Sequence, residues 1–340
     1  MATALNESVK VQEKSPNILQ AINLALTDAM SDDSRVLVLG EDVGDPEGGG
    51  IVGITKGLET RFGNRVRSTP ISEQAIVGAA IGAAIRGWRP VAEIMLMNFT
   101  TVAMDMIVNH AAKLRFMSGG QTSVPITIRT MTGAGRGSGG QHCDYLEAWF
   151  AHTAGMKVVA PSNPADAYGL LRSAIDDPDP VLFIENMPSY RAAAWGRSIA
   201  PGERVPLGKG LVVREGRDLT IVSYSRMVVE ALAAAETLVS QGVEAEVIDL
   251  RTVSPWDREL VVASVQQTRR LMIVHEAVTP FGVGAEIAAT VGHALFGSLK
   301  APIERIGSAY CPVPFSKPLE TAFAPSQGRI VEVAKAMVAS

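Results

Sequence analysis

Short apolar runs rich in β-branched residues alternate with longer, helix-length stretches along the first half of the chain. Apolar runs of this length are typical of strands buried in a parallel sheet, and the intervening stretches are long enough to form crossover helices. We therefore predict strands at 35–40, 89–95, 124–131, 156–162 and 180–186, with helices between them that include 72–87, 100–117 and 164–176.

The alternation stops between residues 187 and 218, where prolines and glycines occur without a helical period. Such a segment is typical of a crossing between domains. The alternation then resumes, which predicts a second α/β series. The predicted fold is α/β, with two doubly wound domains: a flexible segment at 1–15, a first domain at 16–190, a linker at 191–215 and a second domain at 216–340. Strands of the second domain are expected at 219–225, 244–250, 270–277 and 303–308, with helices at 226–241, 257–267, 283–298 and 326–338.

Composition narrows the class of protein. Of the 340 residues 47% are hydrophobic and 19% charged, which suits large buried cores. The net charge of −4 comes without a basic block, so we expect no nucleic-acid partner. The chain starts without an apolar signal core, and its longest apolar run, 75–85, is too short for a bilayer. Two distant cysteines form neither a disulfide framework nor a metal cluster. We expect a cytoplasmic protein that does not enter a membrane.

The stretch GRGSGGQHCD, at 135–144, admits three interpretations. Its spacing matches the G-x-G-x-x-G of dinucleotide sites, but its third glycine opens no apolar helix and the next strand does not end in an acid. Cys143 beside His142 suggests a thiol nucleophile, yet adjacent residues point apart and Asp144 would raise the thiol pKa. The third interpretation is a flexible loop that presents His142 at the carboxyl end of a strand, where it could act as an acid or a base.

Two acidic positions also draw attention. Glu73 lies in the first turn of a helix made of glycine, alanine and aliphatic residues, with Ser72 as its expected N-cap. A first-turn acid is favoured by the helix dipole, but tightly packed surroundings call for a cationic or protonated partner. Glu41 follows the first predicted strand, where an acid is either the edge of a site or part of a solvated loop.

Several long segments occur together in one order: VLVLGEDV, STPISEQAIVGAAIGAAIRGWRPVAEIM, NHAAKLRFMSGG, the long GGQHCDYLEAWFAHTAGMKVVAPSNPADAYGLLRSAIDDPDPVLFIEN, VIDLRTVSPWD and PVPFS. In this the chain resembles the β subunit of the thiamine-diphosphate-dependent first component of 2-oxo acid dehydrogenase complexes, the group of the pyruvate, branched-chain and acetoin dehydrogenases. The resemblance covers roughly residues 17–339. It implies a pyrimidine-binding domain followed by a transketolase C-terminal domain.

The resemblance also implies a shared cofactor site. The chain has no G-D-G pattern for the Mg²⁺ that holds the diphosphate. An α subunit would therefore supply that metal site, typically in an α₂β₂ tetramer that works with a lipoyl acyltransferase core. By resemblance, Glu73 would bond the pyrimidine ring nitrogen, Glu41 would line the same pocket and Phe99 would stack on the ring. His142 would face the substrate. A potassium ion is implied at Ile126, Ala174, Ile175, Asp177 and Asp179.

The chain departs from many relatives at Cys143 and Asp144, where they read Ser and Gln, and at Val102, where some carry Gln. Asp144 adds negative charge near a site that usually receives an anionic 2-oxo acid. This added charge favours a neutral substrate such as acetoin. Three alternatives remain open: a thiamine-dependent acyloin lyase or carboligase without a lipoyl acceptor, a non-catalytic scaffold, and a dinucleotide-binding dehydrogenase.

Overall fold

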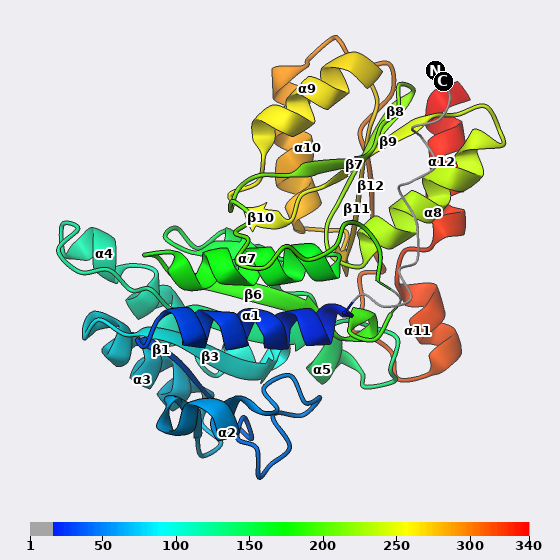
Figure 1. Ribbon diagram of the computed structural model, residues 1–340. Helices are drawn as coiled ribbons and strands as arrows, with labels where there is room; N and C mark the ends of the chain where they lie inside the picture. Colours follow the sequence, from blue (N-terminus) through cyan, green and yellow to red (C-terminus); the bar gives the residue numbers. More distant parts are fainter. Residues whose placement is uncertain (1–15, 193, 340) are drawn as a thin grey trace. The chain divides into compact units, whose positions relative to one another are not determined.

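A computed structural model describes residues 16–192 and 194–339 (Figure 1). The predicted flexible segment 1–15 lies outside the described residues. The chain forms two compact units. The first unit contains residues 16–132 and 149–207, and the second contains 133–148 and 208–339. Residues 133–148 therefore belong to the second unit, although both of their flanks in the sequence belong to the first.

The first unit is built on a parallel sheet with the strand order β5-β6-β4-β3-β1-β2. Its central strands are almost entirely buried, which explains why they appear in the sequence as apolar runs. Their bounds are β1 (Val36–Gly40), β2 (Val66–Ser68), β3 (Arg89–Leu96), β4 (Thr127–Thr132), β5 (Lys157–Val159) and β6 (Val181–Asn186).

Helices cover both faces of this sheet. On one face, α1 (Ile18–Asp32) packs alongside α7 (Pro164–Asp176), and both contribute to one hydrophobic cluster with the strands (Figure 1). The helix α3 (Glu73–Ile85) contacts β1 and β3, and its buried residues lie outside that cluster, so it covers the other face. Shorter helical segments are α2 (Leu58–Phe62), η1 (Gly63–Arg65), η2 (Met97–Thr101), η3 (Met106–Ala111), α4 (Leu114–Met117), α6 (Glu147–Ala151) and η4 (Met187–Ser189).

The second unit has a smaller sheet with the order β12-β11-β8-β9-β7, parallel except for β7, which pairs antiparallel with β9. The helices α8 and α12 pack on each other over one face, while α9 and α10 lie on the other (Figure 1). The bounds are β7 (Leu211–Arg214), β8 (Leu219–Ser223), α8 (Met227–Val239), β9 (Ala245–Asp249), β10 (Thr252–Ser254), α9 (Arg258–Thr268), β11 (Leu271–Val278), α10 (Val283–Ala294), β12 (Glu304–Ser308) and α12 (Gln327–Ala339), with short helices α5 (Gly140–Cys143) and α11 (Lys317–Phe323).

The predicted fold class is confirmed, and a strand is present at each predicted position, although β4 begins three residues later than the predicted 124 and β5 ends three residues before the predicted 162. The stretch 100–117 is helical but is not one continuous helix: 3₁₀, π and α turns follow one another. The hydroxyl groups of Thr100 and Thr101 bond to the carbonyls of Met97 and Asn98, which is how such side chains compete with regular helix formation. Among the described residues, no helix has both the length and the apolar character needed to cross a membrane.

Candidate active site

Glu41 and Glu73 form a pair of acids at one edge of the first sheet. Glu41 follows β1 directly, and Glu73 is the first residue of α3. Both are nearly buried, with 7% and 9% of their surface exposed. Burial raises the pKa of the Glu41 carboxyl, and the charges of Glu73 and Asp42 raise it further. The two carboxyl groups are therefore close enough to interact electrostatically.

Glu41 has hydrogen-bonding capacity that the described residues do not use. Its Oε1 atom is buried and has no hydrogen-bond partner among them. Leaving a buried carboxylate oxygen without a donor is unfavourable, so such atoms are rare in folded proteins. The arrangement is suited to a ligand that brings an N–H or O–H group to this oxygen.

Small residues allow the elements around this pair to approach closely. A Cβ atom on Gly40 would lie 2.8 Å from the carbonyl oxygen of Glu93, so glycine permits the end of β1 to lie against β3. On α3, a Cβ atom at Gly78 would be 3.4 Å from Met106 Sδ. The predicted N-cap, Ser72, is at the expected position, but its side chain makes no capping hydrogen bond.

Phe99 lies in η2, directly after β3, and it is partly buried against the hydrophobic cluster of the first unit. Since β1 and β3 are adjacent and parallel, their carboxyl ends meet at the same edge of the sheet. The structure thus brings Phe99 and Glu41 to one edge, with Glu73 coupled to Glu41 by its charge. Val102, at which some relatives carry Gln, follows shortly after Phe99 in the sequence, and its side chain is 56% exposed.

His142 belongs to the second unit, in the short helix α5. The loop that leads to it turns through glycines with positive φ at 133, 135, 137 and 139. Only glycine adopts such angles readily, so Gly135 and Gly137 of the G-x-G-x-x-G match, together with Gly133 and Gly139, shape a loop before His142.

Cys143 is buried next to His142, in a small cluster with Ala134, Val313 and Phe323. Burial raises the pKa of its thiol to about 11, and the charges of Glu320, Glu276 and Asp144 contribute to the rise. A thiol with this pKa is almost entirely protonated at neutral pH and is a poor nucleophile. The geometry supports the interpretation of Cys143 as a structural residue.

The residues implied for potassium lie together in the first unit, and each has a polar partner. Lys157 Nζ is 2.6 Å from Asp177 Oδ1, and Arg115 Nη1 is 2.7 Å from Asp179 Oδ1. The carbonyls of Ile126, Ala174 and Ile175 accept hydrogen bonds from Val181, Asp177 and Arg89 respectively. Oxygen donors suited to a cation are present, but two cationic side chains already balance both carboxylates. Potassium binding here stays a prediction.

A buried charge cluster in the first unit escaped the sequence analysis. Arg129 on β4 lies 2.8 Å from Glu93 Oε2 and 2.7 Å from Glu185 Oε1, and Tyr190 donates to Glu185 at 2.5 Å. Burial raises the pKa of Glu93, the charge of Glu185 raises it further, and Arg129 lowers it. The one available signal was a charged residue inside each of three apolar strands.

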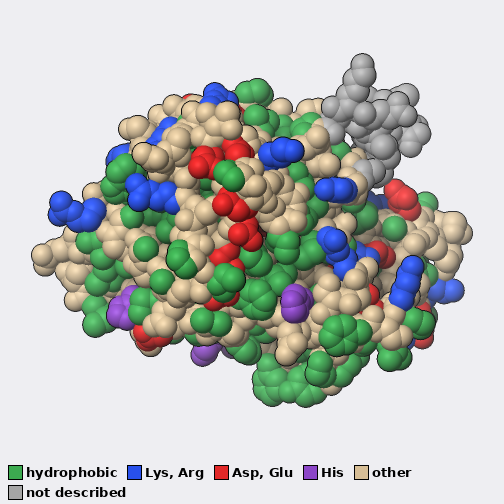
Figure 2. Space-filling model, turned by 90° about the horizontal axis from the view of Figure 1, so that it is seen from below, with side chains coloured by type: hydrophobic (Ala, Val, Ile, Leu, Met, Phe, Trp, Pro, Cys, Tyr) green, Lys and Arg blue, Asp and Glu red, His purple; other side chains and the backbone are tan. Residues whose placement is uncertain are grey.

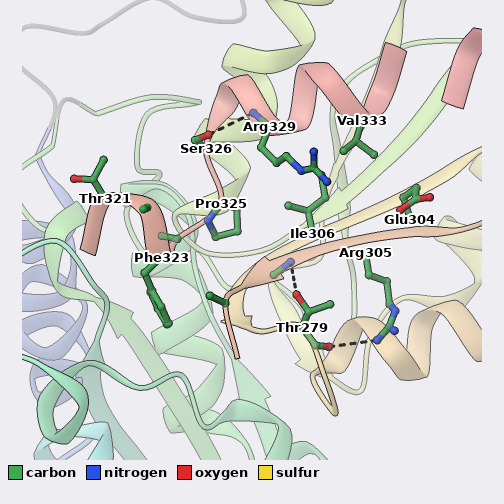
Figure 3. A pocket seen from close by; sticks show the side chains of 14 residues that line it. Thr279, Glu304, Arg305, Ile306, Thr321, Phe323, Pro325, Ser326, Arg329 and Val333 are labelled. Carbon is green, nitrogen blue, oxygen red and sulfur yellow. Dashed lines mark hydrogen bonds between the residues drawn. The ribbon is translucent and has the colours of Figure 1, made fainter. Parts of the chain in front are cut away.

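A cavity of about 470 Å³ in the second unit also escaped the sequence analysis. Thr279, Arg305 and Arg329 line it, and Thr321 and Phe323 reach it from α11 (Figure 3). Arg305 donates to the carbonyl of Thr279 at 3.3 Å. None of the predicted site residues lines this cavity.

Comparison with known proteins also divides the chain into two domains, although the first matched range includes residues 133–148, which pack with the second unit. Residues 14–192 match the family model of the transketolase pyrimidine-binding domain, and residues 208–330 match that of the transketolase C-terminal domain. The β subunit of acetoin:2,6-dichlorophenolindophenol oxidoreductase from Cupriavidus necator is 44% identical, over 94% of this chain and 96% of its own length. The β-2 subunit of a mitochondrial pyruvate dehydrogenase E1 component from Oryza sativa subsp. japonica is 44% identical, over 95% and 86%.

Among solved structures, an inactive β4 tetramer of a split-gene transketolase superposes with a TM-score of 0.76 at 22% identity, covering 96% of this chain and 99% of that one. This likeness supports the fold, while the 44% identities establish the kinship. The chain therefore belongs to the transketolase-like family of β subunits of the thiamine-diphosphate-dependent first components of 2-oxo acid and acetoin dehydrogenases.

Proposed function

We propose that this chain, together with an α subunit, cleaves a 2-oxo acid or acetoin next to its carbonyl and transfers the acyl group to a lipoyl domain. It is then an oxidoreductase subunit. The observation that carries the proposal is the Glu41–Glu73 pair, a buried acidic site in which one oxygen has no donor among the described residues. The names of the relatives favour a dehydrogenase over a lyase or carboligase.

The residues at this edge fit the pyrimidine half of thiamine diphosphate. An aminopyrimidine brings N–H donors to acidic oxygens and a flat ring to an aromatic side chain. Glu73 would hold a proton at a ring nitrogen, Glu41 would accept an N–H hydrogen bond, and Phe99 would stack on the ring. When bound, the cofactor supplies the electron sink for breaking the bond beside the substrate carbonyl. His142 would donate a hydrogen bond to the substrate oxygen or assist the acyl transfer.

The diphosphate of the cofactor is expected to be held by Mg²⁺, and the metal-binding pattern expected for that ion is missing from this sequence. The sequence has no G-D-G, and the described residues contain no group of three or more His, Cys, Asp or Glu placed to hold a metal ion. We therefore assign Mg²⁺ mainly to the α subunit, in an α₂β₂ tetramer that docks on a lipoyl acyltransferase core. A cytoplasmic location and the domain boundaries 16–190 and 216–340 belong to the same proposal. So does a potassium ion held by Ile126, Ala174, Ile175, Asp177 and Asp179.

The surface is consistent with partner subunits. Several large apolar side chains are highly exposed, among them Ile71 at 84%, Phe116 at 91% and Phe296 at 91%. Hydrophobic side chains gather in several places on the face displayed in Figure 2. Exposed apolar surface of this kind is often covered by another protein chain.

Acetoin is the favoured substrate within this class. Asp144 places a carboxylate two residues after His142 and would disfavour an anionic 2-oxo acid by charge repulsion, while a neutral hydroxyketone would not be repelled.

The test is to co-express the chain with its α subunit and measure reduction of a dye acceptor with acetoin, pyruvate and branched-chain 2-oxo acids. We expect turnover that requires both thiamine diphosphate and Mg²⁺, with acetoin the best substrate. Cofactor-dependent carboligation without dye reduction would support the lyase. Absence of any thiamine-dependent reaction would refute the proposal.

A further inference from the structure

Three consecutive backbone N–H groups of the loop before His142 converge on one carboxylate. Gly135 N and Arg136 N lie 2.5 Å and 3.0 Å from Glu320 Oε1, and Gly137 N lies 3.2 Å and 3.1 Å from its two oxygens. Glu320 is part of α11 and is only 4% exposed. A buried carboxylate needs several donors, and backbone N–H groups provide them here. The N–H groups of the G-x-G stretch thus bind the carboxylate of Glu320 in the same chain.

The backbone of the loop has the conformation that this contact requires. Gly135 has φ of 122° and Gly137 has φ of 68°, both in the region that favours glycine. Successive N–H groups in such turns point to one side and form a concave site for an anion. Glycine at 135 and 137 is therefore explained by the contact with Glu320.

A second carboxylate holds the residue just before this turn. Glu276, on β11 and 4% exposed, accepts a hydrogen bond from Ala134 N at 2.7 Å. Arg226 donates to the carbonyl of Ala134 at 3.2 Å. Four consecutive residues, 134–137, are thus fixed by side chains that lie far away in the sequence.

The segment from this turn to His142 has little room to adjust. A Cβ atom on Gly139 would lie 2.3 Å from the ring of Phe315, so that ring packs directly on the loop backbone. Beyond His142, the hydroxyl of Tyr145 lies 3.2 Å from Ser225 Oγ. The α5 turn is consequently held on both sides.

We propose that Glu320 is a positioning residue for the reaction: its carboxylate fixes the backbone of residues 135–137 and thereby sets the position of His142. This inference rests on the role proposed above for His142. Glu320 acts through the loop, because its oxygens are engaged by the loop's own N–H groups.

Hydrogen–deuterium exchange tests the contact without any activity measurement. The variant Glu320→Gln keeps the side-chain volume but removes the charge and replaces one acceptor with a donor. Loss of charge-assisted hydrogen bonds should accelerate amide exchange in residues 135–137 by about tenfold or more. The control is Glu332→Gln, an exposed acid on α12 in the same unit, for which we expect unchanged exchange in the loop. Unchanged exchange in Glu320→Gln would overturn the inference.

A double-mutant cycle tests whether the contact matters through His142. In the assembled holoenzyme, Glu320→Gln should lower kcat by about 10- to 100-fold and change KM by less than about threefold. On the His142→Ala background the same substitution should cause little further loss, because residues that act through one another are not additive. A full further loss on that background, or an unchanged kcat in the single variant, would contradict the positioning role.

A second variant, Glu320→Asp, serves if Glu320→Gln fails to assemble. It retains the charge but has a shorter side chain, so it should give an intermediate increase in amide exchange and an intermediate kcat. Wild-type values for both quantities would overturn the inference. Should the wild-type holoenzyme show no thiamine-dependent turnover, the proposed function is refuted, and exchange alone decides the contact: faster exchange in the variant supports it, and unchanged exchange overturns it.

Discussion

The two units contain buried carboxylates in opposite circumstances. In the first unit, Glu41 has an oxygen without a donor among the described residues, and the neighbouring Glu73 adds a repelling charge. In the second unit, Glu320 receives N–H groups from three consecutive residues. An acid short of donors is ready for a ligand, whereas an acid supplied with donors holds the chain in place. Hydrogen-bond saturation distinguishes a binding role from a scaffolding role more clearly than burial does.

The largest effect is expected at Glu73. Glu73→Ala should lower turnover by about 10³-fold or more, because proton transfer by a positioned acid is lost. Without bound cofactor its melting temperature should not fall, since a repelling charge is removed. Dye-reduction rates of the holoenzyme, and thermal unfolding of the assembled subunits without thiamine diphosphate, measure the two effects. Gln74→Ala, at the exposed neighbouring position in the same helix, is the control and should behave as wild type. An active Glu73→Ala enzyme would contradict a binding role for the Glu41–Glu73 pair.

At Glu320 a loss of stability is expected in addition to the loss of activity. Glu320→Ala leaves three loop N–H groups without their acceptor, which should destabilise the second unit by about 2 kcal/mol. A lower midpoint of urea unfolding would show this. The matched variant Glu332→Ala removes an exposed acid and should change the free energy of unfolding by less than about 0.5 kcal/mol, with little shift of the midpoint. Equal shifts in the two variants would mean that saturation does not stabilise the loop.

A smaller, pH-dependent effect is expected at Glu41. Its pKa in the folded chain is raised above the ordinary 4.5, so its favourable contribution to stability is present below that value and is lost as the pH rises through the folded pKa. Glu41→Gln removes this loss. The melting temperature of the variant should therefore rise relative to wild type as the pH goes from about 4 to about 7. A difference in melting temperature between Glu41→Gln and wild type that stays constant with pH would show that the pKa of Glu41 is not raised in the folded chain.

The smallest effect is expected at Cys143. With its thiol pKa raised to about 11, native Cys311→Ser protein should incorporate almost no thiol reagent at about pH 8. Wild type should incorporate about one equivalent, at the exposed Cys311. Rapid labelling of native Cys311→Ser would show that the loop opens readily, and would weaken the contrast between the two units.

Much of the fold follows from local patterns. The buried strands β1, β3, β6, β8 and β11 are apolar enough to be predicted, because parallel strands covered on both faces leave no polar alternation. Short elements such as α11 escaped prediction because four to seven residues carry too little periodicity. At the start of 100–117, Thr100 and Thr101 bond to nearby carbonyls, and whether such side chains compete with a regular helix is not decided by composition alone.

The candidate site divides in the same way. Glu41, Glu73 and His142 were singled out by their positions in the sequence, whereas Phe99 and the role of each residue came from the family resemblance. The structure supplies the environment that makes Glu41 unusual. Glu320 left no signal, since its partners are backbone N–H groups 183 to 185 residues away in the sequence. Backbone donors do not depend on residue type, so the only related feature of the sequence was the glycine spacing at 135–137, and that spacing suggested a dinucleotide site.

The membership of residues 133–148 in the second unit has a consequence for anyone who dissects this protein. A gene fragment that starts near residue 208 encodes the second sheet and its helices, but it omits the stretch that supplies the donors for Glu276 and Glu320. Such a fragment would expose two acids and an uncovered apolar patch, and we expect it to aggregate. The sequences before and after residue 208 are therefore not independent domains. An exchange of the second unit between relatives has to include residues 133–148 as well.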